Sequence, residues 1–299
     1  MTRHANHIPP NSEYHRALTS DKRRIGRGIL AIALVVGGLM LFSTVAAAAA
    51  VAVDAARGIE SATYSPSIHV AGIAAIALLT PWSMLVQRWL YGVKGASLHS
   101  VLSRFRFDLF GRAVLIITPV WMVVIVLQYL DPMPQTTWTY TDVLWMLAGT
   151  IVLMPLQAAG EEYGFRGLIL RVAGSWTRGA RAGLVMGIVI SSVAFAFVHL
   201  SADLWLNVWY LVFAVATALI TWRTGGIEIA VVLHAGFNVL NFVFDTALRV
   251  DLDAVAADRS ASALDVLPAM LFMIIAAAVV WVRTRQTGPA RTPRPGVSA

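Results

Sequence analysis

Two adjacent carboxylates and an arginine directly follow a long uncharged stretch of the chain. The run Val143–Gly160 holds no charged residue, and Glu161, Glu162 and Arg166 come next. Ionisable side chains at the end of a membrane-buried segment are costly and are usually partnered and functional. Glu162 and Arg166 are four residues apart and can pair on one helical face, whereas Glu161 faces elsewhere and is available for acid–base chemistry. The structural alternative is a helix end at the membrane surface with a solvated ion pair.

Further polar side chains interrupt two later apolar runs. His199 stands near the end of one run, and His234, Asn238 and Asn241 form a stripe on one helical face of another. A single histidine in a membrane helix is usually a hydrogen-bonded packing residue. Taken with Glu161, however, these residues come from three helices, and polar groups in a membrane bundle turn inward. A carboxylate, two imidazoles and an amide together can activate water and stabilise an oxyanion.

Three short motifs follow one another on these segments. They are Glu-Glu-x-x-x-Arg from Glu161, Phe-x-x-x-His from Phe195, and His-x-x-x-Asn from His234. In this order the motifs resemble the CPBP intramembrane protease family, also known as the CAAX prenyl endopeptidase or abortive-infection family. The resemblance covers a core of about residues 141–246. It implies a polytopic membrane endopeptidase whose site lies inside the bilayer region, near the cytoplasmic face.

The resemblance also implies a role for each motif residue. Glu161 would activate the attacking water, and His199 would help to hold that water. His234 and Asn238 would bind the carbonyl oxygen of the substrate as negative charge develops on it. Three supporting residues complete the set: Glu162, Arg166 and Phe195, the last packed beneath the histidine. Asn241 lies outside the motifs, and its role is open.

Zinc is a candidate cofactor for the same residues. Glu161, His199 and His234 form a set of ligands that could hold zinc with one open position. The sequence contains no His-Glu-x-x-His motif, and the three residues are scattered over three helices. We therefore expect a glutamate-activated water without a cofactor, and we keep a metal-dependent endopeptidase as the alternative. Members of the resembled family have been described in both ways.

Two other functions are compatible with the same residues. Buried Glu, His and Arg groups also serve proton relays in proton-coupled transporters, although this chain shows no internal repeat of the kind that many carriers have. A non-catalytic membrane immunity or scaffold protein could keep the motifs for packing alone. Convergence of the four polar residues on one place would favour catalysis. The expected substrate is a peptide or protein in or at the membrane, and nothing in the sequence indicates a groove for a prenyl chain.

The composition identifies an integral membrane protein. Of the 299 residues, 58% are hydrophobic and only 13% are charged, and the mean hydropathy is +0.71. The absence of cysteine excludes disulfides, thiolate metal sites and cysteine nucleophiles. The net charge of +7 lies in short loops between apolar runs. Membrane topology and contact with an anionic lipid bilayer explain this charge better than nucleic-acid binding does.

Uncharged runs predict the elements that must position the site. There are eight of them: Gly28–Val53, Ser61–Gln87, Ala113–Leu130, Val143–Gly160, Ala182–Ala202, Leu204–Trp222, Ile229–Phe244 and Val266–Val282. A spanning helix needs about 20 apolar residues, with a range of roughly 17–25. We therefore predict an all-α, polytopic transmembrane helix bundle of about eight spans, in a membrane domain covering residues 28–283.

The loops between these runs alternate in charge. Those at residues 88–112, 166–181 and 223, together with the C-terminal tail, are basic, whereas the intervening loops are poor in Lys and Arg. The positive-inside rule then places both termini in the cytoplasm and the protein in the inner (plasma) membrane.

Three segments outside the spans complete the predicted organisation. Residues 1–27 are expected to be a basic, disordered cytoplasmic tail, and residues 284–299, rich in Pro and Arg, a disordered C-terminal tail. The mixed apolar and basic segment Ser97–Gly111 is expected to be an amphipathic helix at the membrane surface.

Overall fold

The computed structural model describes residues 8–59, 64–130, 132–258 and 261–294. Within these ranges, eight helices are long and apolar enough to cross a membrane. The predicted all-α polytopic bundle is therefore confirmed, and the protein is a multi-pass membrane protein. Three predicted segments lie partly outside the described ranges: the tails at residues 1–27 and 284–299, and the start of the run Ser61–Gln87.

The helices follow one another along the chain with short connections. In order they are η1 (Tyr14–Arg16), α1 (Ile25–Ala56), α2 (Pro66–Ala77), α3 (Leu79–Tyr91), η2 (Gly95–Leu98), α4 (Phe107–Val126), η3 (Leu127–Tyr129), α5 (Tyr140–Glu162), η4 (Tyr163–Ile169), α6 (Leu170–Gly174), α7 (Ala180–Val198), α8 (Leu204–Thr224), α9 (Glu228–Ala247), α10 (Leu252–Asp258) and α11 (Ala263–Thr284). The spans extend past the uncharged runs because charged residues such as Arg27 and Asp54 are accommodated in their end turns.

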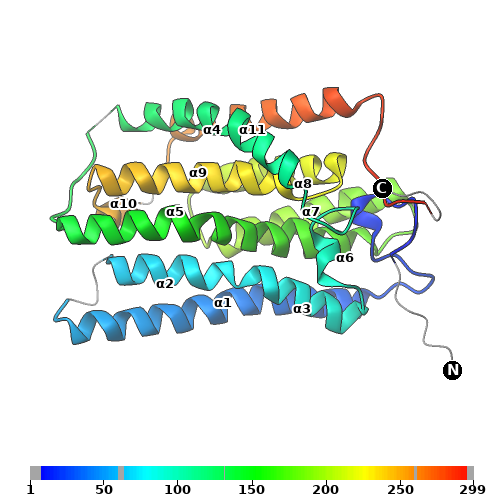
Figure 1. Ribbon diagram of the computed structural model, residues 1–299, viewed down its shortest axis with the longest axis horizontal. Helices are drawn as coiled ribbons and strands as arrows, with labels where there is room; N and C mark the ends of the chain where they lie inside the picture. Colours follow the sequence, from blue (N-terminus) through cyan, green and yellow to red (C-terminus); the bar gives the residue numbers. More distant parts are fainter. Residues whose placement is uncertain (1–7, 60–63, 131, 259–260, 295–299) are drawn as a thin grey trace.

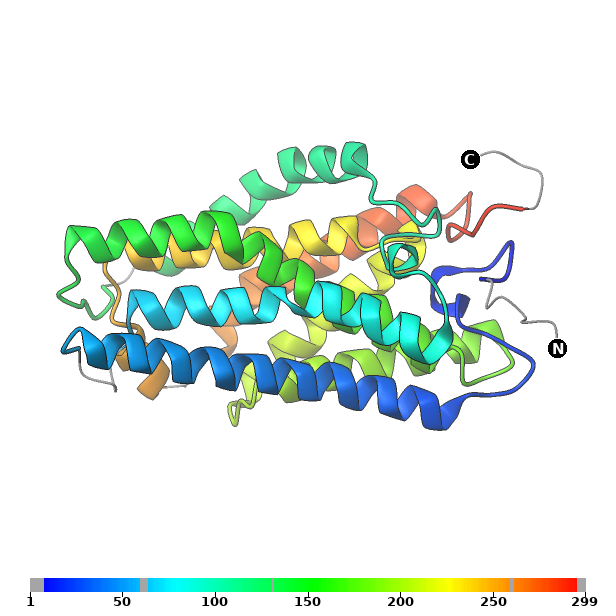
Figure 2. The ribbon, with the colours of Figure 1, turned by 60° about the horizontal axis from the view of Figure 1, so that its bottom comes forward.

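The long helices lie side by side, with α5 and α9 in the middle of the bundle (Figure 1). α2 lies between α1 and α5 (Figure 2), and α4 packs on the other side of α9. The indole Nε1 of Trp121 in α4 donates to the carbonyl oxygen of Leu233 in α9 at 2.9 Å. Gly236 permits this approach, because a Cβ there would lie 2.8 Å from the Trp121 ring. The central pair of α5 and α9 carries most of the residues with candidate chemistry.

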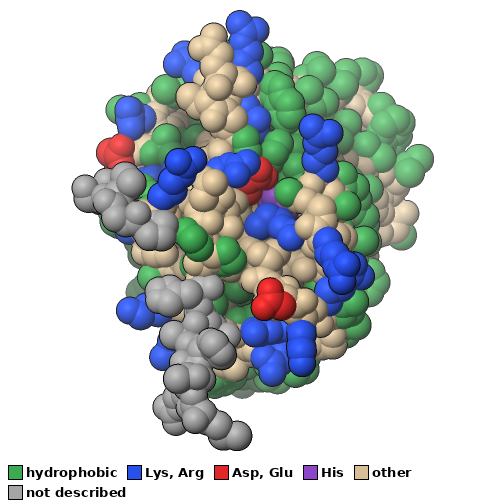
Figure 3. Space-filling model, turned by 90° about the vertical axis from the view of Figure 1, so that its right-hand side faces the viewer, with side chains coloured by type: hydrophobic (Ala, Val, Ile, Leu, Met, Phe, Trp, Pro, Cys, Tyr) green, Lys and Arg blue, Asp and Glu red, His purple; other side chains and the backbone are tan. Residues whose placement is uncertain are grey.

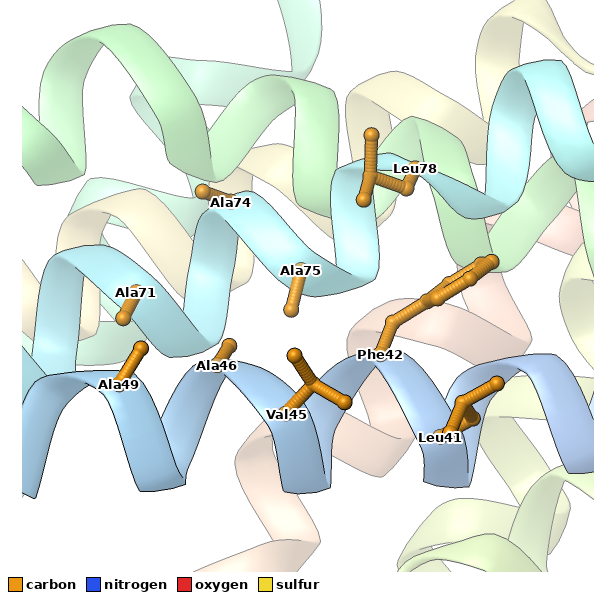
Figure 4. A pocket seen from close by; sticks show the side chains of 9 residues that line it. All are labelled: Leu41, Phe42, Val45, Ala46, Ala49, Ala71, Ala74, Ala75 and Leu78. Carbon is orange, nitrogen blue, oxygen red and sulfur yellow. The ribbon is translucent and has the colours of Figure 1, made fainter.

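The outer surface of the bundle is apolar, as contact with lipid requires. Leu115, Ile116 and Phe197 are 77%, 70% and 68% exposed. A groove of about 580 Å³ separates α1 from α2, and all nine side chains that line it are apolar (Figure 4). Exposed apolar side chains on α4 and α7, together with the apolar groove at α1 and α2, indicate a surface that faces hydrocarbon rather than water.

Both described ends of the chain lie at one end of the bundle (Figure 1). Lys and Arg side chains are spread over this end face, and few acidic side chains are visible among them (Figure 3). Because the number of membrane-spanning helices in the described residues is even, the two chain ends lie on the same side of the bundle. The charge of the face is what the positive-inside rule associates with a cytoplasmic surface.

The two tails are packed in the described residues, which corrects the prediction that they are disordered. Tyr14 is 1% exposed, and its hydroxyl donates to the carbonyl oxygen of Leu98 at 2.5 Å. Residues 8–24 and 285–294 also pair through backbone hydrogen bonds. The prediction was wrong because it relied on composition. Composition does not reveal that a few aromatic and polar side chains of the tails are buried against distant parts of the chain.

His15 in this N-terminal segment makes the fold sensitive to acid. The side chain is fully buried, and burial lowers its pKa below the ordinary value of 6.5. The unfolded chain then binds this proton more readily than the folded one, so stability is present above about pH 6.5 and falls as the pH drops below it. We expect His15→Gln to reduce the pH dependence of the thermal midpoint between about pH 7 and pH 5. An unchanged slope in the variant would contradict this.

The predicted surface helix Ser97–Gly111 is wrong as a single element. η2 ends at Leu98, an irregular stretch follows, and α4 begins at Phe107. Arg106 explains the break, because its Nε and Nη2 donate to the Glu228 carboxylate at 2.9 and 2.6 Å. Glu228 is fully buried at the start of α9. This ion pair fixes the connection to the bundle instead of leaving it free to lie on lipid.

Candidate active site

The two candidate glutamates lie where the α5 span changes its helical geometry. α5 ends at Glu162, and the next seven residues, Tyr163–Ile169, form a π-helix that is buried throughout. Segments of π-helix are rare and often occur at functional sites. Gly160 allows α2 to pack directly against this turn, because a Cβ there would lie 2.3 Å from the carbonyl oxygen of Ile76. The carboxylates are thus held in the interior of the bundle.

Glu162 and Arg166 form the ion pair that their spacing predicts. Arg166 Nε lies 3.2 Å from Glu162 Oε2, and both side chains are fully buried. The same nitrogen donates to Thr217 Oγ1 in α8 at 2.8 Å, and the guanidinium lies 4.1 Å from the ring centre of Phe195. The solvated pair at a helix end is therefore excluded. Arg166 joins three helices and supplies the positive charge next to the two carboxylates.

His234 in α9 lies between the two glutamates. Its Nδ1 is 2.8 Å from Glu162 Oε1, and its Nε2 is 3.4 Å from Glu161 Oε2. The histidine is 4% exposed. Both ring nitrogens face carboxylates, so His234 links the two glutamates.

Gln157 is a residue of the site that the sequence analysis missed. Its Nε2 donates to Glu161 Oε1 at 2.8 Å, and its Oε1 accepts a hydrogen bond from Asn238 Nδ2 at 3.0 Å. The available signal was a polar side chain one turn before Glu161 in an otherwise apolar stretch. Glu161 Oε2, by contrast, is buried without a hydrogen-bond partner among the described residues. One oxygen of Glu161 is thus occupied, and the other is available to accept a proton.

His199 follows directly after α7 and is oriented by two contacts. Its Nδ1 lies 2.7 Å from the carbonyl oxygen of Phe195, and its ring stacks on Tyr210 with 4.0 Å between ring centres. A carbonyl oxygen can only accept, so Nδ1 carries the hydrogen in this bond. In the neutral ring Nε2 is then an acceptor. His199 is therefore suited to accept a hydrogen bond from a water molecule.

The structure brings the predicted motif residues into one region of the bundle. Glu161 and Glu162 contact His234 directly, and Asn238 joins them through Gln157. The link to His199 is the ring of Phe195, whose centre lies 4.7 Å from the His199 ring and 5.9 Å from the His234 ring. Phe195 therefore packs against both histidine rings.

Asn241 does not take part in this network. Its Nδ2 donates to the carbonyl oxygen of Phe237 in its own helix at 2.9 Å. It lies on the same stripe of α9 as His234 and Asn238, but its hydrogen bond is local. The side-chain amide of Asn241 is therefore bonded within α9.

The predicted zinc ligands are not arranged as a metal site. In the ranges that the structure describes, no three His, Asp or Glu side chains form a group that could hold a metal ion. Glu161 and His234 are neighbours, but His199 is joined to them through the ring of Phe195, whose centre lies between the two histidine rings at 4.7 and 5.9 Å. The arrangement does not fit the three-ligand set, so the chemistry below contains no metal step.

Gln157 offers a test of how the network positions Glu161. We expect Gln157→Leu to fold, because the volume is similar, and to lower the rate of any Glu161-dependent reaction by about 10–100-fold, which corresponds to loss of a hydrogen bond to a charged group. The loss should appear in kcat more than in KM. The matched control is Asn241→Leu, which removes an amide from the same region but no contact to a carboxylate. Equal rates for the two variants would show that Gln157 does not position Glu161.

The comparisons with known proteins match this part of the chain. Residues 141–240 match the family model described as type II CAAX prenyl endopeptidase Rce1-like, and all seven predicted motif residues lie in this range. The uncharacterized protein YyaK of Bacillus subtilis (strain 168) is 31% identical over 105 residues, which are 34% of this chain and 35% of YyaK. The chain thus matches about a third of that relative's length. No solved structure matches the chain.

Proposed function

We propose that this chain is an intramembrane endopeptidase, because residues 141–240 match the family model of Rce1-like type II CAAX prenyl endopeptidases. Its substrate is a membrane-associated peptide or protein, cleaved at a peptide bond near the C-terminus or in the membrane. The observation that carries the proposal is the buried Oε2 of Glu161, which accepts no hydrogen bond from the residues that the structure describes and lies 3.4 Å from His234 Nε2. A buried carboxylate oxygen of this kind is what a water-activating base requires.

In the proposed reaction, Glu161 Oε2 removes a proton from a water molecule. The water oxygen then attacks the carbonyl carbon of the scissile peptide bond. Gln157 holds the other Glu161 oxygen, so the reacting oxygen keeps its orientation during the step. His199 accepts a hydrogen bond from the water through Nε2, which its contact with Phe195 leaves as the acceptor. Oriented reactants of this kind lower the barrier through proximity.

The same residues complete the cleavage. Asn238 uses one hydrogen of its amide for Gln157, and the second hydrogen is directed to the carbonyl oxygen of the substrate as charge develops there. Glu161 then gives its proton to the leaving nitrogen, and the C–N bond breaks. His234 Nε2 lies 3.4 Å from the oxygen that holds this proton and can share it. Glu162 and Arg166 fix the position of His234 and do not touch the substrate.

The proposed location is the inner (plasma) membrane, with both termini in the cytoplasm. The basic end face carries both described chain ends, which supports this orientation. The native chain has no cysteine, so a single introduced cysteine reports its own side of the membrane. We expect Val255→Cys to be labelled by a membrane-impermeant maleimide only from outside, and Gln286→Cys only from the cytoplasmic side. The opposite labelling of the pair would invert the topology.

A comparison of membrane peptides tests the proposed activity in cells. We expect membranes that contain the wild-type chain to hold peptide termini that are absent when Glu161→Ala is expressed at the same level. Substrate peptides identified in this way also show whether a prenylated cysteine is present. Identical peptide sets from wild type and variant, at matched expression, would count against an endopeptidase.

One observation favours a second function. Glu161, His234 and Glu162 form a buried series of groups that can exchange a proton, with the fixed positive charge of Arg166 beside it, as proton-coupled transporters use. Proton uptake into vesicles that requires Glu161, with no peptide cleavage, would favour this function. Absence of both peptide cleavage and proton uptake in the wild type would favour a non-catalytic immunity or scaffold protein.

A further inference from the structure

A second polar pocket lies at the end of the bundle opposite the chain termini. It has a volume of about 430 Å³ and is formed by the last turn of α1, the start of α2 and the start of α5. These helix ends lie together at the left of Figure 1. Thr141 and Trp145, which line the pocket, are at least 16 residues from Glu161 along the sequence of α5, or about 24 Å at the α-helical rise of 1.5 Å per residue. The pocket is therefore separate from the proposed proteolytic site.

Asp54 supplies the pocket with a buried negative charge. The residue is 1% exposed and lines the pocket. Its Oδ2 accepts a hydrogen bond from Ser65 Oγ, whereas its Oδ1 has no hydrogen-bond partner in the described part of the chain. A buried carboxylate oxygen without a donor is costly. A ligand in the pocket that carries a hydrogen-bond donor could satisfy Asp54 Oδ1.

The other polar lining groups define what such a ligand carries. Asp142 adds a second carboxylate, of which Oδ2 already accepts hydrogen bonds from Thr139. Arg57 adds one guanidinium, which suits a phosphate group. Two carboxylates and one guanidinium in a single pocket match a zwitterion with an ammonium group and a phosphate. The same arrangement is unfavourable for a purely anionic ligand.

The surroundings of the pocket place it at the boundary between lipid and water. Trp145, which lines it, is 65% exposed, and Leu144 beside it is 67% exposed. Ile151 and Val152, further along the same helix, are 61% and 64% exposed. Tryptophan is enriched at the level of the lipid headgroups, with apolar side chains below it. A lipid whose headgroup occupied the pocket would have its acyl chains along this face.

We propose that this pocket binds the headgroup of a phospholipid with a primary amine, that is, a phosphoethanolamine headgroup. The ammonium group donates to Asp54 Oδ1, and the phosphate pairs with Arg57. A choline headgroup has the same charge but no N–H, so it cannot satisfy the carboxylate oxygen. A serine headgroup adds a carboxylate that faces two aspartates. The site is independent of the proposed proteolytic function.

Binding of lipids to the purified full-length chain in detergent tests the proposal. Native mass spectrometry would compare phosphatidylethanolamine, its N-methyl and N,N-dimethyl forms, and phosphatidylcholine, all with the same acyl chains. We expect affinity to fall along this series, with phosphatidylcholine bound about tenfold or more weakly, which corresponds to one lost hydrogen bond to a charged group. This series uses the wild-type protein alone. Equal affinity for all four lipids would overturn the proposal.

Two variants separate the two halves of the headgroup. Asp54→Asn should reduce the affinity for phosphatidylethanolamine to that for phosphatidylcholine, and Arg57→Gln should weaken both lipids. Asp108→Asn is the control, because its exposed carboxylate pairs with Arg112 on the surface, away from the pocket; it should change neither affinity. An unchanged preference in Asp54→Asn would refute the assignment. Soluble glycerophosphoethanolamine that competes as well as the lipid would show that the pocket takes a soluble amine and not a membrane lipid.

Discussion

Replacing Glu161 by glutamine should leave the protein folded and lower peptide hydrolysis by about 10²–10⁴-fold, the usual contribution of a general base. The glutamine side chain has the same shape, and its amide oxygen can still accept the hydrogen bond from Gln157. In the wild type, Glu161 Oε2 has no hydrogen-bond partner among the described residues and can take a proton from water. The amide nitrogen that replaces this oxygen in the variant cannot. The measurement is the turnover of purified variant and wild type in detergent, at equal folded concentration.

Glu162→Gln is the comparison for this variant. It also removes one negative charge from the network, but it removes the partner of Arg166 and His234 rather than the proposed base. We expect its turnover per folded molecule to fall less than that of Glu161→Gln. The reverse order would assign the base to Glu162.

Replacing Arg166 by alanine should reduce the stability of the protein by about 3–5 kcal/mol, because it leaves a fully buried carboxylate without its partner. The variant also loses the hydrogen bond to Thr217 and the contact with Phe195. Folded yield and thermal midpoint should therefore both fall together with activity. The double variant Arg166→Ala, Glu162→Gln should recover part of the stability, since the uncompensated charge is gone.

Arg112→Ala is a matched control for the effect of Arg166→Ala. Arg112 pairs with Asp108 at the same i, i+4 spacing, but their side chains are 69% and 73% exposed. A pair of this kind contributes about 0–1 kcal/mol, so this variant should unfold like the wild type. Full stability of Arg166→Ala, with activity selectively lost, would instead indicate that Arg166 acts directly on the substrate.

Hydropathy and charge were sufficient to predict the eight spans. A membrane-spanning helix must be continuous and apolar over a fixed length, and this requirement is visible in the sequence. The pairing of Glu162 with Arg166 was also predictable, because it depends only on the spacing within one helix. The π-helix that follows Glu162 could not be predicted, because the sequence pattern does not distinguish a π-helix from an α-helix.

Contacts between helices account for most of what the sequence did not reveal. The link from Glu161 through Gln157 to Asn238 depends on how α5 and α9 are rotated against each other. The position of His234 between both carboxylates depends on the same packing. The order in the tails has a similar origin, because Tyr14 is buried against Leu98 far along the chain. Local pattern carries no information on such long-range contacts.

The most direct test of the central claim is the cleavage of a defined peptide by the purified protein in lipid vesicles. A synthetic membrane-anchored peptide with a prenylated C-terminal cysteine, and the same peptide without the prenyl group, would be incubated with wild type and Glu161→Gln, with and without a chelator. The products would be identified by mass spectrometry. We predict that wild type releases a C-terminal fragment in the presence of chelator and that Glu161→Gln releases it at least about 100-fold more slowly. Equal cleavage by both proteins would contradict the assignment of Glu161, and wild-type activity that is lost on chelation and restored by zinc would contradict the metal-free mechanism.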